Sequence, residues 1–220
     1  MSKVKLVVFD FDGVMIDSPF YSCWQLFDKV LGCEKEDRIL KKKFFEGDID
    51  YKTWSKETTN LYIKYGLNER IFYETIKKHI KPMEGLEETL NELKKRKIKS
   101  AVISGSILNI FWFLERRYKI RVDHVSFASQ FYFKNGKLQG GKFTNYDFEG
   151  KVEVLGRICE KEKISFKDCA VVGDSKNDLP IFKKVGLAIA FNPKSKEVEK
   201  SAHIVIKTKD LREILNYIQE

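Results

Sequence analysis

The chain has 220 residues, 43% of them hydrophobic and 33% charged, and its formal net charge at pH 7 is +9. This size allows one large domain or a core domain with a smaller insert, and the composition is that of a soluble globular protein. No stretch reaches transmembrane length, and the apolar run Leu6–Phe9 is too short for a signal peptide, so we expect a cytoplasmic protein without a membrane partner.

The positive charge is compatible with a nucleic-acid partner, with an anionic substrate, or with a lysine-rich surface. The basic residues form short clusters that are interleaved with acidic or apolar residues in helix-like stretches: Lys41–Lys43, Lys94–Lys97 and Arg116–Arg117. This pattern favours solvated helix faces. A nucleic-acid-binding protein is therefore a remote alternative, and we expect no nucleic-acid partner.

The cysteines and histidines predict neither disulfides nor a zinc site. The four cysteines contain no CxxC pair and are expected to be reduced, small apolar residues. The three histidines lie at no spacing that is typical of zinc ligands.

The first part of the chain predicts one strand followed by a helical block. Residues 4–9 form an apolar run that predicts a buried strand. Residues 20–80 are rich in aromatic and charged residues with apolar spacings of three and four, which predicts four amphipathic helices with breaks near Gly32, Gly47 and Gly66.

From Glu84 onward, predicted helices and strands alternate. In chain order we expect a helix at 84–97, a strand at 99–104, a helix at 106–118, a hairpin within 125–144 that turns at Asn135-Gly136, a helix at 151–162, a strand at 169–172, a helix at 178–185, strands at 187–191 and 204–206, and a closing helix at 210–218. This alternation predicts an α/β fold with a parallel sheet, into which the helical block is inserted after the first strand.

Two acids follow the first predicted strand, in the sequence Asp10-Phe11-Asp12-Gly13. A purely structural interpretation is a strand that ends in a polar turn, where Asp and Gly are common. However, two carboxylates this close repel each other unless a cation or a proton offsets their charge. The pair therefore suits a Mg²⁺ site beside a carboxylate nucleophile.

Two further predicted strands end in polar clusters, and we expect all three clusters to converge. Ser104-Gly105 ends one strand at the start of the next predicted helix, and another strand runs into Asp174 and Asp178. In an open parallel sheet, ligands bind beyond the carboxyl ends of the strands. Free N–H groups at a helix start favour a phosphate, and clustered carboxylates favour Mg²⁺.

These residue types predict hydrolysis of a phosphate ester. Asp10 can attack phosphorus to form an aspartyl-phosphate, while Asp12 can protonate the leaving alkoxide and later activate water. A lysine is expected beside the phosphate, with Lys151 as the first choice and Lys142 as the second. We expect a Mg²⁺-dependent phosphomonoester hydrolase acting on a small phosphorylated metabolite, with phosphotransfer, as in a phosphomutase, as the alternative reaction.

With these motifs in this order, the chain resembles the haloacid dehalogenase superfamily, and within it the phosphoserine phosphatase-like branch. The motifs are Phe9–Gly13, Val102–Gly105, Gly150-Lys151, Val172–Leu179 and Gly186–Asn192. The resemblance implies a Rossmann-like parallel-sheet core, residues 1–16 and 82–220, with an inserted α-helical cap, residues 17–81. It also implies the site residues: Asp10 as nucleophile, Asp12 as acid and base, Mg²⁺ on Asp10, the Asp12 carbonyl and Asp174 with support from Asp178, and the phosphate on Ser104, Gly105, Lys151 and Asn177.

The chain departs from that branch where the amino-acid part of the substrate is recognised. Phosphoserine phosphatases carry a glutamate shortly after the first motif and an arginine in the cap, and the corresponding positions here are Pro19 and Thr58. The cap instead offers aromatic residues such as Phe44 and Trp54, most of which are expected in the helix core, with one or two facing the substrate. A phosphoserine phosphatase proper is kept as an alternative, and the sequence predicts no oligomeric state.

Overall fold

A seven-stranded sheet forms the centre of the computed structural model, which describes residues 3–218. The strand order is β6-β5-β4-β1-β7-β8-β9, and every neighbouring pair is parallel except β5 and β6. The strands are β1 (Leu6–Phe9), β4 (Lys99–Ile107), β5 (His124–Lys134), β6 (Lys137–Phe143), β7 (Cys169–Gly173), β8 (Leu187–Phe191) and β9 (Ile204–Ile206). This arrangement confirms the predicted α/β fold.

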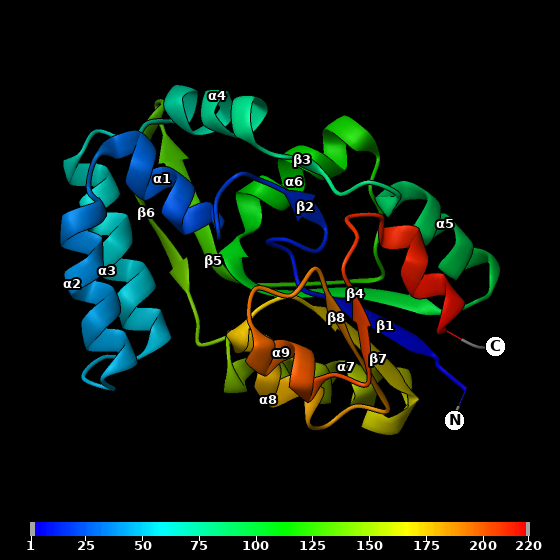
Figure 1. The fold of residues 1–220 in the computed structure, drawn as a ribbon. Coiled ribbons are helices and arrows are strands. Elements are labelled where there is room, and N and C mark those ends of the chain that lie inside the picture. The colour runs from blue at the N-terminus through cyan, green and yellow to red at the C-terminus, as the bar shows by residue number, and fades with distance from the viewer. Residues whose placement is uncertain (1–2, 219–220) are drawn as a thin grey trace.

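Helices cover both faces of this sheet (Figure 1). One face carries α5 (Leu86–Lys95) and α6 (Leu108–Tyr118); the other carries α7 (Glu149–Glu162), α8 (Leu179–Phe182) and α9 (Lys196–Ser201). Successive side chains of β1 alternate between two buried clusters: Val7 and Phe9 belong to the first, and Leu6 and Val8 to the second. This period of two explains why the central strands consist of continuous apolar runs.

The helical block at residues 20–80 contains the four helices that the sequence predicts. They are α1 (Cys23–Leu31), α2 (Glu34–Phe45), α3 (Tyr51–Lys64) and α4 (Glu69–His79), and they lie between β2 (Ile16–Asp17) and β3 (Lys81–Pro82), which pair antiparallel. In Figure 1 they lie beyond one end of the sheet and beside the β5–β6 hairpin. We call residues 17–81 the insert; their division from the core as a separate domain stays a prediction.

Three expectations about local structure are wrong. Strand β4 does not end at Ser104 but continues to Ile107, whose pairing with Ser129 extends the ladder after a register shift, so Ser104 and Gly105 are not at a helix start. The helix expected at 178–185 is a 3₁₀ turn followed by the four-residue helix α8, and the closing helix is a 3₁₀ segment, Leu211–Asn216.

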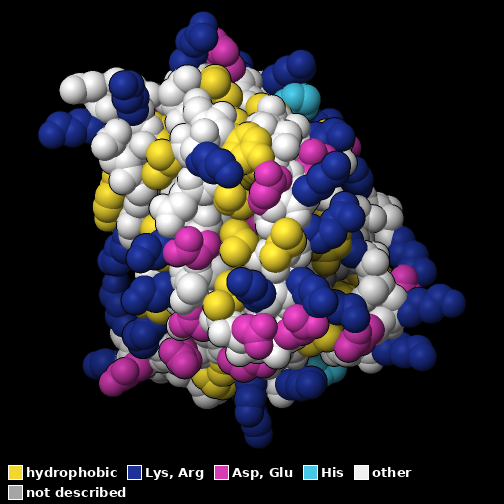
Figure 2. Space-filling view, turned by 90° about the vertical axis from the view of Figure 1, so that its left-hand side faces the viewer, with side chains coloured by type: hydrophobic (Ala, Val, Ile, Leu, Met, Phe, Trp, Pro, Cys, Tyr) yellow, Lys and Arg dark blue, Asp and Glu magenta, His cyan; other side chains and the backbone are white. Residues whose placement is uncertain are grey.

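The charge on the face that carries the insert gives no support to a nucleic-acid interface there. Figure 2 shows the face on which the helices of the insert lie, where lysines and arginines are spread widely, with acidic and hydrophobic side chains between them. Such dispersion differs from the continuous basic stripe that tracks a phosphate backbone. None of the helices within residues 3–218 is long and apolar enough to cross a membrane.

A buried ionic cluster stabilises the insert. The Lys41 ammonium lies 2.9 Å from an Asp28 oxygen and 2.6 Å from an Asp37 oxygen, and both acids are almost fully buried. Lys41→Met leaves two buried carboxylates without their cation, so we expect the free energy of unfolding in urea to fall by about 3–5 kcal/mol. Lys29→Met, which removes an exposed pair with Glu34, is the control and should cost less than about 1 kcal/mol. Equal losses in the two variants would contradict this account.

Candidate active site

A cavity of about 530 Å³ lies where β1, β4 and β7 end and the insert begins. Its core wall comes from the last residues of β4, from the segments that follow β1 and β7, and from the loop before α7; it includes Asp10, Asp12, Ser104, Gly105, Ser106, Asp147 and Asn177. Its other wall comes from α1, α2 and α3 and is mostly aromatic. The sequence-predicted convergence of three polar clusters at one sheet edge is thus present in the structure.

Asp10 and Lys151 form the buried centre of this site. Asp10 follows β1, and its backbone N–H donates to the Val172 carbonyl at 2.9 Å, which ties the residue to β7. Its carboxylate accepts a hydrogen bond from the Lys151 ammonium at 2.9 Å. The same ammonium donates to Asp178 at 2.6 Å and lies 3.8 Å from Asp147. Burial opposes the charge on Lys151, but these carboxylates outweigh it and hold the Lys151 pKa above its ordinary value.

Asp12 lies between the core and the first helix of the insert. One of its oxygens accepts hydrogen bonds from the Cys23 backbone N–H at 3.1 Å and from the Cys23 thiol at 2.8 Å. Burial raises the pKa of Asp12, and the neighbouring charge of Asp10 raises it further, although the Cys23 hydrogen bond opposes the shift. Cys23 is a partner that the sequence did not predict, because nothing distinguishes it from an ordinary apolar helix residue.

Asp174 offers the least satisfied oxygens in the site. Apart from an ion pair between Oδ2 and the Lys194 ammonium at 2.7 Å, neither oxygen has a hydrogen-bond donor among residues 3–218. Burial raises the Asp174 pKa to about 7, although Lys194 opposes this. At Gly13, where φ is +82°, a Cβ atom would lie 1.9 Å from Asp174 Oδ2, so glycine is required there.

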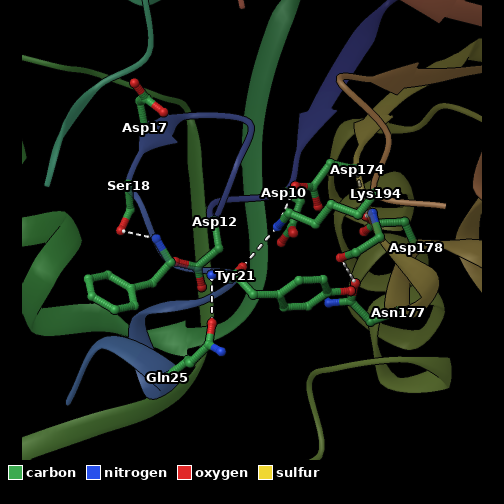
Figure 3. A network of polar contacts seen from close by, with 12 residues as sticks. Asp10, Asp12, Asp17, Ser18, Tyr21, Gln25, Asp174, Asn177, Asp178 and Lys194 are labelled. Atoms are coloured by element: carbon green, nitrogen blue, oxygen red, sulfur yellow. Dashed lines mark hydrogen bonds and ion pairs between the residues drawn. The ribbon is translucent and has the colours of Figure 1, made fainter. Parts of the chain in front are cut away.

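Oxygens from Asp10, Asp174 and Asp178 lie within 4.8 Å of one another, and this cluster fits a hard divalent cation such as Mg²⁺. Figure 3 shows these three side chains gathered together with Lys194 beside them. Lys194 also donates to the Tyr21 carbonyl at 2.8 Å, and its ammonium lies 4.2 Å from the centre of the Tyr21 ring. Lys194 thus links the acidic cluster to the start of the insert, a contact that no sequence motif revealed.

Hydrogen bonds among the surrounding loops hold the site in place, and they involve Asp178, Asn177 and Asp147. Asp178 Oδ2 accepts from the backbone N–H groups of Asp174 and Ser175, at 3.0 and 3.2 Å. The Asn177 amide donates to Asp147 at 2.8 Å. Burial raises the Asp147 pKa to about 7, against the opposing charge of Lys151. The sequence did not reveal Asp147, because this residue lies in a loop without a periodic pattern.

Gly105 joins the core to the insert through its carbonyl oxygen. That oxygen accepts hydrogen bonds from the Tyr51 hydroxyl at 2.6 Å and from the Trp24 indole N–H at 3.2 Å. A Cβ atom at Gly105 would lie 2.3 Å from Asp147 Oδ2 and 2.6 Å from the Tyr51 hydroxyl oxygen. Its neighbour Ser104 is buried, and its hydroxyl accepts from the Ser106 N–H at 3.2 Å.

Gly105→Ala should displace Asp147 and Tyr51 and lower kcat/KM for phosphate release by about 10²-fold, because small misplacements in a preorganised site are costly. The matched control is Gly156→Ala in α7. There the atom nearest to a new Cβ is a Phe166 ring carbon at 3.7 Å, an ordinary van der Waals contact. The control should keep the parent activity. Activity of Gly105→Ala within about threefold of the parent would show that the close approach has no role.

Three residues considered from the sequence lie outside the cavity. Lys142 is on β6, paired with Gln130, and does not line the cavity. Thr58 is buried in the insert and donates its hydroxyl to Asp37 at 2.7 Å. Pro19 lines a separate hollow together with Ser18 and Lys209.

Comparison with known proteins agrees with this geometry. Residues 4–186 match a model of the haloacid dehalogenase-like hydrolase family. Phosphoserine phosphatase of Methanocaldococcus jannaschii is 34% identical over 99% of each chain, and that of Wolinella succinogenes is 31% identical over 98% of this chain and all of the other.

Solved structures give the same result. A substrate-bound phosphoserine phosphatase complex superposes with a TM-score of 0.79 and 31% identity over 100% of both chains. A phospho-aspartyl intermediate analogue of phosphoserine phosphatase has a TM-score of 0.79 and 32% identity, covering 99% of this chain and 100% of the other. The chain therefore belongs to the haloacid dehalogenase-like hydrolases and is a phosphatase of that family.

Proposed function

We propose that this phosphatase is a Mg²⁺-dependent phosphomonoester hydrolase that transfers the phosphoryl group of a small metabolite to Asp10 and then to water. The observation that carries the proposal is the buried Asp10 carboxylate, held 2.9 Å from the Lys151 ammonium at the base of the cavity. The cavity volume of about 530 Å³ suits a small molecule. A related phosphatase for which a phospho-aspartyl intermediate analogue is known supports the same route.

Asp10 and Asp12 divide the chemistry between them. Asp10 attacks phosphorus, the ester bond breaks, and the Asp12 proton goes to the departing alkoxide. Asp12 then accepts a proton from the water that attacks the aspartyl-phosphate, which releases inorganic phosphate and restores Asp10. The raised pKa of Asp12 suits this role, because a fraction of protonated acid is needed at neutral pH.

The remaining predicted residues hold the phosphate and the metal. Lys151 neutralises charge on the phosphoryl oxygens, with Ser104, Gly105 and Asn177 as further hydrogen-bonding partners. Mg²⁺ would be held by Asp10, the Asp12 carbonyl and Asp174, with Asp178 in support, and when bound it reduces repulsion between the phosphate and Asp10. Both Asp178 oxygens already accept hydrogen bonds, so Asp178 mainly orients Lys151 and the Asp174 loop.

Metal removal tests the proposal directly. Phosphate release from a panel of phosphate esters should stop in excess EDTA and return with added Mg²⁺. Asp174→Asn should need at least about tenfold more Mg²⁺ for half-maximal rate, because it removes a charged metal ligand, and calorimetric titration of the unliganded protein with Mg²⁺ should show the same loss of affinity. Undiminished hydrolysis in EDTA, or no hydrolysis of any ester with Mg²⁺, would contradict the proposal.

Phosphoserine hydrolysis is the second candidate. It is supported by the Methanocaldococcus jannaschii relative of that name, which matches this chain along 99% of its length. The same panel decides it, since phosphoserine would then be the preferred ester.

A further inference from the structure

We propose that the preferred substrate is the phosphate ester of an uncharged alcohol with an aromatic or similarly bulky apolar group. This inference rests on the proposed hydrolysis and concerns the alcohol part of the substrate, which departs from phosphorus when the phosphoryl group is transferred to Asp10. Within the described chain, it follows from the insert side of the cavity, which is built from six aromatic residues together with one that the core contributes.

Aromatic rings form the wall opposite Asp10. The insert supplies Tyr21, Trp24, Phe44, Phe45, Tyr51 and Trp54, and the loop before α7 supplies Phe148. The rings contact one another: the Tyr51 and Trp54 centroids are 5.0 Å apart, and those of Phe44 and Phe148 are 5.6 Å apart. Burial of a ligand's apolar surface against such a wall makes the binding free energy more favourable, and the ring faces and edges allow aromatic stacking.

The polar atoms of three of these rings are already used within the protein. The Tyr51 hydroxyl and the Trp24 indole N–H both donate to the Gly105 carbonyl. The Trp54 indole N–H donates to Asp37 at 3.2 Å. These three residues therefore offer the ligand mainly carbon surface, and their hydrogen bonds fix the orientation of the wall before a ligand enters.

The insert also has no free ionic partner for an amino acid. Among its described lining residues, Lys41 is the charged one, and its ammonium is already paired with the buried Asp28 and Asp37. A substrate carboxylate would have to compete with two buried aspartates for that ammonium. A substrate ammonium would find no insert carboxylate, and Lys41 lies 5.9 Å from the Trp54 ring centre, where it opposes a cation on that ring.

The backbone of Phe148 is consistent with a functional position for its ring. Phe148 has φ +48° and ψ −120°, in the left-handed half of φ space that non-glycine residues rarely occupy. Such conformations persist where the surroundings hold them and cluster at ligand sites. Here the residue sits between Asp147 and α7, the helix that carries Lys151, and its ring closes the aromatic wall against Phe44.

The test compares esters whose leaving groups are all unactivated primary alcohols: benzyl phosphate, ethyl phosphate, O-phosphoserine and phosphocholine, each with the full chain and Mg²⁺. Because burial of one phenyl ring favours binding, kcat/KM for benzyl phosphate should exceed that for each of the others by about ten- to a hundredfold.

Phe45→Ala should reduce the benzyl-to-ethyl ratio of kcat/KM by about threefold or more, and because the Phe45 side chain is 72% exposed, its removal should not disturb folding. Tyr132→Ala, an exposed ring outside the cavity, should leave this ratio unchanged.

The outcomes separate this inference from the proposed function. Phosphoserine hydrolysed as well as or better than benzyl phosphate would overturn the inference and leave the hydrolase intact. Preference for phosphocholine would also overturn it, in favour of cation recognition by the rings. No hydrolysis of any ester with Mg²⁺ would instead overturn the proposed function. A benzyl-to-ethyl ratio that Phe45→Ala does not change would show that the aromatic wall is not the source of selectivity.

Discussion

Asp10→Asn is expected to lower kcat/KM for phosphate release by about 10⁴-fold or more, because the amide cannot attack phosphorus and no second carboxylate can take the same position. The variant should nevertheless fold. Asp178 and Asp147 remain as partners for the buried Lys151 ammonium, and the Asp10 backbone bond to Val172 does not depend on the side chain. The measurement is steady-state phosphate release, with circular dichroism to verify the fold.

An acid-quench experiment makes this prediction sharper. Brief mixing of the parent protein with ³²P-labelled ester should trap phosphate on the protein in a form that alkali releases, and Asp10→Asn should trap none. Asp17→Asn is the matched control, since Asp17 follows the same motif but pairs with Lys81 and Lys209 away from the cavity. Trapping that survives in Asp10→Asn would assign the nucleophile to another residue.

The sequence predicted the centre of the site because each central residue follows an apolar strand or opens a helix. Asp10 and Asp174 directly follow β1 and β7, and Ser104 ends the apolar run within β4; the carboxyl ends of these neighbouring parallel strands must meet. Only its place at a helix start favours Lys151 over Lys142 in the sequence, and in the structure the Lys151 ammonium lies 2.9 Å from an Asp10 oxygen. Residues that end a regular strand or open a regular helix can therefore be placed close together from the sequence alone.

The parts that could not be predicted lie where tertiary contacts decide. Lys194 reaches Asp174 from the segment after β8, and Asp147, in an aperiodic loop, accepts a hydrogen bond from the distant Asn177. Strand β4 extends beyond its apolar run because Ile107 pairs with Ser129 of β5. Each depends on how distant segments pack, which composition and local spacing do not encode.

The aromatic wall favours an apolar phosphate ester, whereas the similar proteins are phosphoserine phosphatases. This difference in expected substrate concerns the insert. The proposed catalytic groups lie in the core, and the whole chain, insert included, superposes on a phosphoserine phosphatase with a TM-score of 0.79. We expect selectivity to come from α1 to α3, where Thr58 donates a hydrogen bond to Asp37 and the Lys41 ammonium is paired with the same aspartate. Because the two parts of the site lie on different segments, the same hydrolysis can serve different leaving groups.

Lys151→Met should remove both activity and stability, and this combination distinguishes Lys151 from a residue that only binds phosphate. Its side chain is 2% exposed and faces three carboxylates, so its loss leaves buried negative charge uncompensated. We expect kcat/KM to fall by about 10³-fold, and the free energy of unfolding in EDTA to fall by about 3–5 kcal/mol.

Added Mg²⁺ should narrow the gap in stability between Lys151→Met and the parent, because a divalent cation bound to Asp10 and Asp174 offsets part of the same negative charge. It should not restore the rate, since the ammonium that faces the phosphoryl oxygens is still missing. Lys151→Arg tests the geometry of the site. It keeps the positive charge, but the larger planar guanidinium has to fit a fully enclosed position. Relative to Lys151→Met, it should therefore recover more of the unfolding free energy than of kcat/KM. A Lys151→Met protein as stable as the parent in EDTA would mean that the cluster of Asp10, Asp147 and Asp178 takes up protons when its cation is lost, and that Lys151 serves the phosphate alone.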